Sequence, residues 1–314
     1  MTESATHPEV DRQLPSGEEI FLDHVGHFVR EPQAASCALE GAGFAPAPVS
    51  IQVNPDPAGG APRPTGTGNV TAMFSRGYIE ILFKTANTPI GNELDAALAR
   101  YSGVHLAAFC VADAAAAHRR LEASGFRVRP LVFFERPVTT EAGTGTAAFT
   151  VARVERDEMA EGRIQILTHR TEDMVWQKRW LNHPNGVTGL LDIVIAVADV
   201  DEATGRFARF TNRAAAPGAM GCSICLDRGR IELLKSGALV DLLPDIAIPR
   251  LPFIAGYALR TASLDRLMAA LRQGGINARR NGDVVVASFP AALGIGVWWF
   301  VENPAALPWR RQQA

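Results

Sequence analysis

The sequence predicts an α+β protein made of four βαβββ modules that associate as two pairs. A short pattern recurs four times along the chain: an apolar strand, then a helix, and often a Gly-Phe or Gly-Ile step. A single module of this kind leaves one face of its sheet uncovered, so two modules have to pack together. The chain has 314 residues, of which 47% are hydrophobic, and is long enough to bury the cores of two such pairs.

Each copy begins with an apolar strand that is followed by a helix. The opening strands are predicted at residues 21–29, 104–111, 190–197 and 254–259. The helices are predicted from about residue 32, at 113–124, at about 201–210 and at 263–272. Further short strands, such as 128–134 and 284–288, complete the modules, and long loops are predicted at about residues 54–69 and 138–147.

The helix boundaries rest on capping residues and apolar stripes. Ser263 is expected to cap the last helix, whose apolar stripe contains Leu264, Leu267 and Leu271. Asp113 and Asp201 are expected to cap two earlier helices in the same way.

The repeat also predicts the domain boundaries. Residues 1–18 are polar and aperiodic, and we expect a loose tail there. Residues 19–182 are expected to form the first module pair and residues 183–314 the second, joined near the turn sequence His183-Pro-Asn-Gly186.

Charge and composition exclude several classes of function. A formal net charge of −2 attracts neither nucleic acid nor an anionic membrane surface. No apolar stretch is long enough to span a bilayer, and no signal peptide is visible. The chain has four cysteines, too few for a disulfide framework at this length, and the Cys222-Ser-Ile-Cys225 spacing lacks the second pair that a zinc site needs. We therefore expect a cytoplasmic enzyme or binding protein.

Four polar residues interrupt apolar strands: His24, Glu80, His105 and Gln165. Such side chains are costly to bury unless they are paired or bind a metal, so two imidazoles, one carboxylate and one amide indicate one metal site. This ligand set suits Fe(II), Mn(II), Ni(II) or Zn(II). Gly26, two residues after His24 on the same face of its strand, would leave room for a ligand.

The motifs resemble those of the vicinal oxygen chelate superfamily. Leu22-Asp-His-Val25 is similar to its opening strand and Tyr78-Ile-Glu-Ile-Leu82 to its ligand-bearing last strand. Together with Gly66-Thr-Gly-Asn69 and His183-Pro-Asn-Gly186, they resemble a glyoxalase-like domain branch. The resemblance implies two paired half-barrels, with metal ligands on the first and last strands of adjacent modules.

In that scheme the four polar residues occupy the four ligand positions of the first half. The second half offers Ile193 and Glu232, then Gly256 or Tyr257 and a tryptophan, without a histidine. The resemblance therefore implies a metal in the first half and a metal-free second half.

The implied function is a metal-dependent isomerase, lyase or dioxygenase acting on a small oxygen-chelating substrate through an enolate-like intermediate. Glu80 is the catalytic candidate; Gln165 cannot exchange a proton, which disfavours glutathione-dependent glyoxalase activity. Asn69 and His169 are the candidates for substrate binding. The alternatives are a metal-free protein that binds or sequesters a small molecule and a structural paralogue with an empty barrel. The sequence is compatible with a homodimer and does not specify the oligomeric state.

Overall fold

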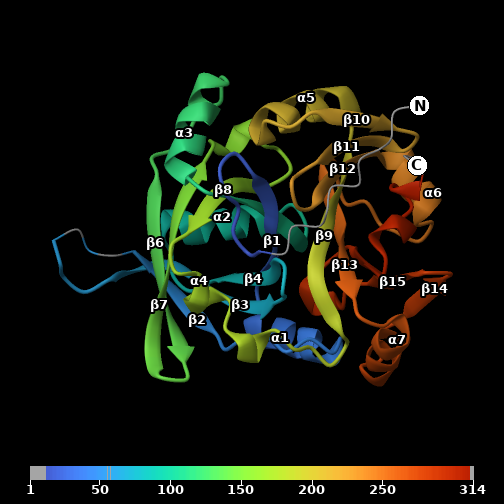
Figure 1. Ribbon diagram of the computed structural model, residues 1–314, viewed down its shortest axis with the longest axis horizontal. Helices are drawn as coiled ribbons and strands as arrows, with labels where there is room; N and C mark the ends of the chain where they lie inside the picture. The colour runs from blue at the N-terminus through green and yellow to red at the C-terminus, as the bar shows by residue number, and fades with distance from the viewer. Residues whose placement is uncertain (1–11, 55, 57, 312–314) are drawn as a thin grey trace.

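The computed structural model describes residues 12–54, 56 and 58–311, and it contains two eight-stranded sheets (Figure 1). The first sheet is a closed barrel in the order β1-β4-β3-β2-β6-β7-β8-β5. Its strands are β1 (Ile20–Val29), β2 (Ser50–Asn54), β3 (Arg63–Met73), β4 (Tyr78–Lys84), β5 (Gly103–Val111), β6 (Val132–Thr140), β7 (Gly143–Arg153) and β8 (Arg163–His169).

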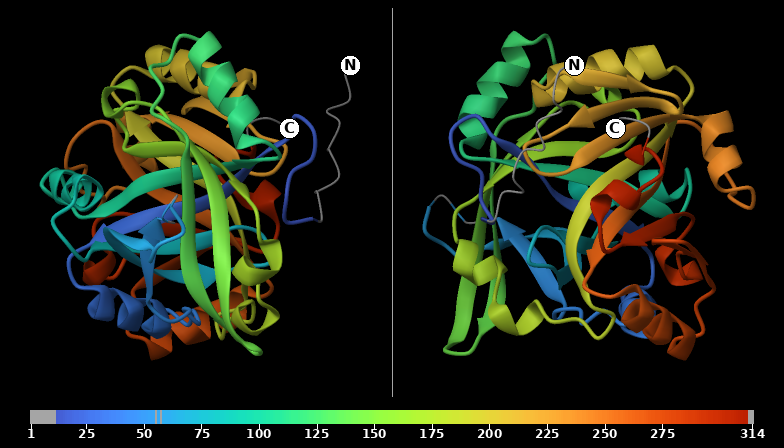
Figure 2. Two further views of the ribbon diagram at one scale, coloured as in Figure 1. Left: turned by 90° about the vertical axis from the view of Figure 1, so that its left-hand side faces the viewer. Right: turned by 45° about the vertical axis from the view of Figure 1, so that its right-hand side comes forward.

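The second sheet runs in the order β10-β11-β12-β9-β13-β16-β15-β14. Its strands are β9 (Val187–Val197), β10 (Ala215–Gly218), β11 (Gly221–Cys225), β12 (Arg230–Lys235), β13 (Phe253–Thr261), β14 (Ala278–Asn281), β15 (Val284–Ser288) and β16 (Val297–Val301). The barrel and this sheet lie side by side, as Figure 1 and the right-hand view of Figure 2 show.

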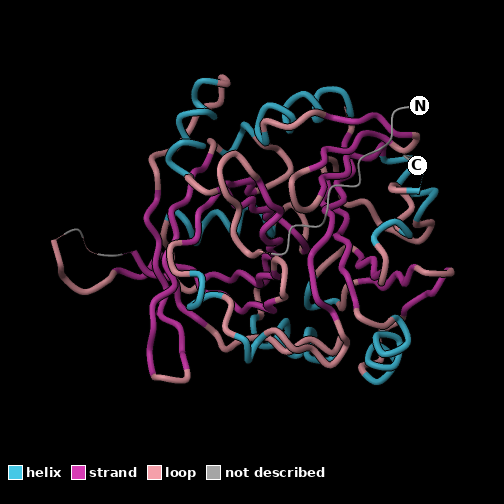
Figure 3. Tube along the Cα trace, viewed as in Figure 1, coloured by secondary structure: helices cyan, strands magenta, loops and turns pink. Residues whose placement is uncertain are grey.

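The helices lie outside both sheets, and Figure 3 shows them around the strands. They are α1 (Pro32–Gly41), α2 (Pro89–Leu98), α3 (Ala114–Ala123), α4 (Glu172–Val175), α5 (Val200–Thr211), α6 (Ser236–Leu242) and α7 (Leu264–Gln273). In the described part of the chain, none of them has the length and apolar character that crossing a bilayer requires.

The predicted fold class and its four modules are confirmed. In every module the opening strand pairs in parallel with the closing strand: β1 with β4, β5 with β8, β9 with β12, and β13 with β16. The first pair of modules goes further than a half-barrel, because β2 and β6 also pair, at Val53 and Glu135, and close the sheet.

Local chemistry sets the helix boundaries. Ser263 and Asp113 cap their helices as expected, each through a side-chain oxygen that accepts a backbone N–H. Asp201 is not a cap: Asp199 accepts from the N–H of Glu202, so α5 begins one residue earlier than predicted.

Of the two predicted long loops, the second is mostly strand and the first is strand over its later part. Strand β3 already begins at Arg63, and residues 138–147 form the tip of the β6–β7 hairpin, with a turn only between Thr140 and Gly143. Their glycine and proline content suggested loops, but the ladders formed with partner strands override this local preference.

The described end of the predicted tail packs against the body of the protein. The backbone oxygen of Arg12 accepts a hydrogen bond of 2.7 Å from Arg228, and Leu14 packs against the barrel core. The rest of the tail, residues 1–11, lies outside the described residues.

A buried polar network ties the two sheets together. His27 Nδ1 donates to the carbonyl oxygen of Leu293 at 2.8 Å, and the Tyr257 hydroxyl, which accepts from Trp298 at 2.7 Å, lies 2.9 Å from His27 Nε2. Burial lowers the pKa of His27 to about 4, so this imidazole is neutral at physiological pH. His27 therefore belongs to the junction of the halves and not to the barrel interior.

Candidate metal and ligand site

The barrel encloses a cavity of about 60 Å³, to which all eight strands contribute. That is room for several water molecules or part of a small ligand. The polar residues that line the cavity are His24, Gln52, Asn54, Thr65, Thr67, Asn69, Tyr78, Glu80, Arg136, Arg153, Arg163 and Gln165. Of the predicted site residues, the structure therefore brings His24, Asn69, Glu80 and Gln165 together.

A β-bulge in β1 lets two successive polar residues serve the site. Leu22 pairs with Phe109 and His24 with Ala108, which leaves Asp23 as the extra residue between them. A bulge interrupts the alternation of faces in a strand. Asp23 is therefore able to contact the side chain of His24 instead of pointing to the opposite face.

Asp23 connects two histidines. Its carboxylate lies 2.6 Å from Nδ1 of His24 and 2.9 Å from Nε2 of His169, all three side chains being buried. Burial by itself would raise the pKa of Asp23, but the charge interactions and hydrogen bonds with His169 and His24 hold it well below its usual range. An ionised carboxylate only accepts hydrogen bonds, so each of these ring nitrogens carries its proton.

This arrangement leaves Nε2 of His24 with a free lone pair in the neutral imidazole. That nitrogen lies 3.5 Å from Oε2 of Glu80. The other oxygen of Glu80 accepts a hydrogen bond of 2.6 Å from the Asn69 amide, and Tyr78 stacks on the His24 ring at 4.3 Å. The His24 imidazole and the Glu80 carboxylate are thus held in place by the neighbouring side chains of Asp23, Asn69 and Tyr78.

Gln165 is held by an arginine. The Arg153 guanidinium donates through Nε to Oε1 of Gln165 at 3.0 Å. An amide oxygen has a second lone pair, so this bond leaves Gln165 able to accept one more partner.

The structure does not bring His105 to this cavity. His105 donates from Nε2 to the carbonyl oxygen of Tyr101 at 2.8 Å, and it lines a separate cavity beside Phe28 and Glu93. Burial lowers the pKa of His105 to about 4.

The strand register explains that placement. Glu80 pairs with Gly26 and Gln165 pairs with Ala108, while β1 and β5 pair His24 with Ala108 and Gly26 with Leu106. This symmetry makes Leu106 the counterpart of His24.

His105 is the extra residue of the second bulge, because Gly26 pairs with Leu106 and His27 with Val104. It is therefore the counterpart of Asp23 and not of His24. Gly26 accommodates Leu106 rather than a ligand, since a Cβ atom at Gly26 would lie 2.9 Å from the Leu106 Cβ.

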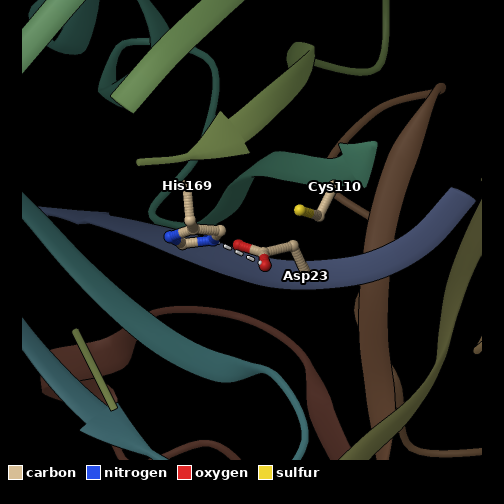
Figure 4. A group of neighbouring side chains, drawn as sticks. All are labelled: Asp23, Cys110 and His169. Carbon is tan, nitrogen blue, oxygen red and sulfur yellow. Dashed lines mark hydrogen bonds and ion pairs between the residues drawn. The ribbon is translucent and has the colours of Figure 1, made fainter. Parts of the chain in front are cut away.

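His169 lies next to the cavity lining rather than in it. With Asp23 and Cys110 it forms a group whose ligand atoms lie within 4.8 Å of one another, so this group could hold a metal ion (Figure 4). Burial raises the pKa of the Cys110 thiol well above its usual value, which disfavours the thiolate that metals bind. Asp23 is moreover engaged by both histidines, and we therefore interpret Asp23 and His169 as a support for His24.

Sequence reasoning missed Asp23, Arg136 and Arg153. Asp23 is visible as a second polar residue in an apolar strand, but strict alternation assigns it to the other face. Arg136 and Arg153 sit at strand positions that give no distinct pattern, and only the closure of the barrel brings them beside Glu80.

The fold and the cavity define a protein of the vicinal oxygen chelate type. A family model described as a glyoxalase-like domain matches residues 22–211, more than half of the chain. The chain therefore belongs to the glyoxalase-like domain family, as the motifs predicted. No curated protein sequence matches it.

Solved structures share the fold at low sequence identity. A hypothetical protein from Staphylococcus aureus is similar over 90% of this chain and 98% of its own, with 10% identity and a TM-score of 0.63. The Mn(II)-bound glyoxalase from Novosphingobium aromaticivorans is similar over 90% of this chain and 81% of its own, with 15% identity and a TM-score of 0.51. A variant of 4-hydroxymandelate synthase from Streptomyces coelicolor is similar over 90% of this chain and 92% of its own, with 9% identity and a TM-score of 0.52.

Proposed function

We propose that the barrel binds one divalent metal ion through His24 Nε2, Glu80 and Gln165 and acts as a metal-dependent enzyme on a small molecule with neighbouring oxygen atoms. The observation that carries the proposal is the geometry around His24. Its Nε2 faces Glu80 at 3.5 Å while Asp23 fixes Nδ1 at 2.6 Å. Metal-bound imidazoles commonly donate their other ring N–H to a carboxylate in this way, which fixes the orientation of the ring.

The donor set fits an open metal site. An imidazole, a carboxylate and an amide oxygen suit a borderline or hard divalent ion, and Leu106 leaves the fourth position without a protein ligand. Catalytic sites keep such a position for water or substrate. The bound ion would supply Lewis-acid polarisation of the substrate oxygens, worth several kcal/mol.

The chain's own residues limit the reaction. Glu80 is the sole carboxylate among the described residues that line the cavity, and Asn69 holds its Oε1. Glu80 and His24 are therefore the groups available to hold or move a proton, and Gln165 orients without exchanging one. The proposal covers isomerase, lyase and dioxygenase chemistry, which share the activation of a chelated substrate.

Titration of metal-stripped protein with Mn(II), followed by calorimetry and by the EPR signal of the free ion, tests the proposal. We expect one site in the wild type and its loss in His24→Asn. His105→Asn is the matched control, because His105 is an equally buried histidine on the neighbouring strand but outside the cavity. Binding that survives in His24→Asn, or that His105→Asn removes to the same extent, would contradict the proposed ligand set.

A metal-free binding protein is the second candidate. Two observations favour it: Leu106 stands at the fourth ligand position, and Arg153 places a positive charge beside Gln165. The same titration separates the two candidates, because a metal-free binding protein takes up no stoichiometric Mn(II).

A further inference from the structure

The barrel cavity contains more positive than negative charge. Three arginines line it, Arg136, Arg153 and Arg163, against the single carboxylate of Glu80. Arg163 already has a carboxylate partner outside the cavity lining: its guanidinium pairs with Glu93 at 3.1 Å, a carboxylate that it shares with Arg129 and Arg156.

Arg136 and Arg153 have no carboxylate partner within 4.0 Å among residues 12–54, 56 and 58–311. The one hydrogen bond that Arg153 makes there runs from Nε to Gln165, which leaves its two terminal nitrogens for other acceptors. Arg136 is buried, and its guanidinium charge interacts favourably with the side chains of Tyr78 and Glu80. Two unpaired guanidinium groups therefore border the cavity from β6 and β7.

Such an arrangement is costly without a ligand. Burying a charged group without a partner removes its hydration and returns little. Burial lowers the pKa of both arginines, that of Arg153 to about 9, in agreement with their removal from water. A protein that keeps two such groups in its functional cavity pays a stability cost that an anionic ligand would relieve.

We infer that Arg136 and Arg153 bind the carboxylate group of the small molecule that enters the barrel. A guanidinium presents a planar fork of N–H donors that matches the two oxygens of a carboxylate. In the metal-free cavity the charges of Arg136, Arg153 and Glu80 alone sum to +1, and Arg163, which shares Glu93 with two other arginines, adds to the positive side, so the cavity favours an anionic group.

This inference deepens the proposed function, on which it rests for the placement of the ligand beside His24 and Glu80. The carboxylate would be anchored on the β6–β7 side, and the rest of the molecule would extend toward His24 and Glu80. Arg153 contacts Gln165 directly, so the anchored group and the reacting part lie within one small cavity. The ligand class is therefore a small carboxylic acid.

The test measures anion binding to metal-stripped protein in EDTA by calorimetry and thermal shift. The probes are malonate, its neutral counterpart malonamide, and inorganic phosphate. We expect malonate to bind and raise the melting temperature, malonamide to have no effect, and phosphate to bind more weakly than malonate. Equal effects of malonate and malonamide, or tighter binding of phosphate, would overturn the inference.

Substitutions then locate the site. Arg136→Gln and Arg153→Gln are each expected to weaken malonate binding by roughly tenfold to a hundredfold, the usual value of a charged hydrogen bond. Arg129→Gln is the matched control, because Arg129 pairs with Glu93 at 3.1 Å and does not line this cavity. It should change the affinity by less than about twofold.

Arg153→Lys adds a variant that keeps the charge, in case the glutamine variants fold poorly. It should bind malonate more weakly than the wild type and more tightly than Arg153→Gln. Malonate binding that is unchanged in Arg136→Gln and Arg153→Gln refutes the inference.

The metal and anion experiments fail independently. Mn(II) binding with no preference for malonate over malonamide refutes the carboxylate site alone. Malonate binding without Mn(II) binding refutes the metal proposal alone.

Discussion

The two halves of the molecule use the same strand positions for opposite purposes. The register makes Asp192, Glu232, Gly256 and Trp299 of the second sheet the counterparts of His24, Glu80, Leu106 and Gln165 in the barrel. In the barrel these positions line a cavity. In the second sheet two of them, Asp192 and Trp299, contact the C-terminal segment of residues 309–310.

Residues of that segment supply the hydrogen-bond and ion-pair partners of the buried Asp192 carboxylate in the second half. Trp309 donates from Nε1 to Asp192 at 2.7 Å, Arg310 donates from Nε to the same carboxylate at 2.9 Å, and Trp309 packs edge-on against Trp299 at 5.2 Å. The barrel instead leaves Arg136 and Arg153 without carboxylate partners within the described residues. On the proposed function, a module pair binds a ligand where its concave polar groups stay unpaired, and it is a structural unit where a side chain of the protein pairs them.

Removing the arginine of the second half should have the largest effect on stability. Arg310→Gln leaves the buried Asp192 carboxylate without its ion-pair partner, and breaking a buried pair costs about 3–5 kcal/mol. Urea denaturation measures the loss. Arg311→Gln, next to it and exposed, should change stability by less than about 0.5 kcal/mol. Equal effects of the two substitutions would show that the segment does not neutralise Asp192.

The sequence predicts the repeat and the difference between the two halves, but it does not predict which residues of the modules are equivalent. The fourfold repeat and the lack of histidines at the ligand positions of the second half follow from sequence pattern, because strand and helix periodicities are local. The equivalence of His24 with Leu106 does not, because one bulge residue in each of β1 and β5 shifts the alignment by one position. The same shift makes Asp192, and not Ile193, the counterpart of His24 in the second sheet.

The pairing of the arginines was equally beyond sequence reasoning. Arg163 forms an ion pair with Glu93 on α2. Arg153, whose side chain lines the same cavity, donates a hydrogen bond to Gln165 instead. These partners are set by barrel closure and by the packing of α2, both of which depend on contacts between distant parts of the chain.

Restoring the missing histidine should strengthen the site of the first half. Leu106→His places a second imidazole at the position that the register makes equivalent to His24. On the proposed metal site, a fourth ligand should tighten Mn(II) binding by at least about tenfold, or about 1.4 kcal/mol. Leu167→His is the control, since Leu167 lines the same cavity at a position outside the four. A tighter affinity in the control, or none in Leu106→His, contradicts the equivalence.

The smallest effect concerns the carboxylate of the second half that corresponds to Glu80. Burial and the charge of the neighbouring Asp192 raise the pKa of Glu232 to about 8, although a hydrogen bond from Ser223 and the charges of Arg230 and Arg310 act in the opposite direction. The folded protein therefore binds this proton more tightly than the unfolded chain does. Its stabilising contribution is complete below about pH 4.5 and is lost as the pH rises toward and through 8.

Glu232→Gln removes that pH dependence, because a neutral amide has no proton to lose. Relative to the wild type, the variant should gain at least about 1 kcal/mol of stability between pH 5 and pH 9, since each pKa unit corresponds to about 1.4 kcal/mol. Urea midpoints at the two pH values measure the gain, with the exposed Asp241→Asn as a control that should show none. A gain that is the same at both pH values would mean that Glu232 is already ionised in the folded protein. The second half would then hold a charged carboxylate at the position of Glu80, and its contrast with the proposed ligand-binding half would rest on the C-terminal segment alone.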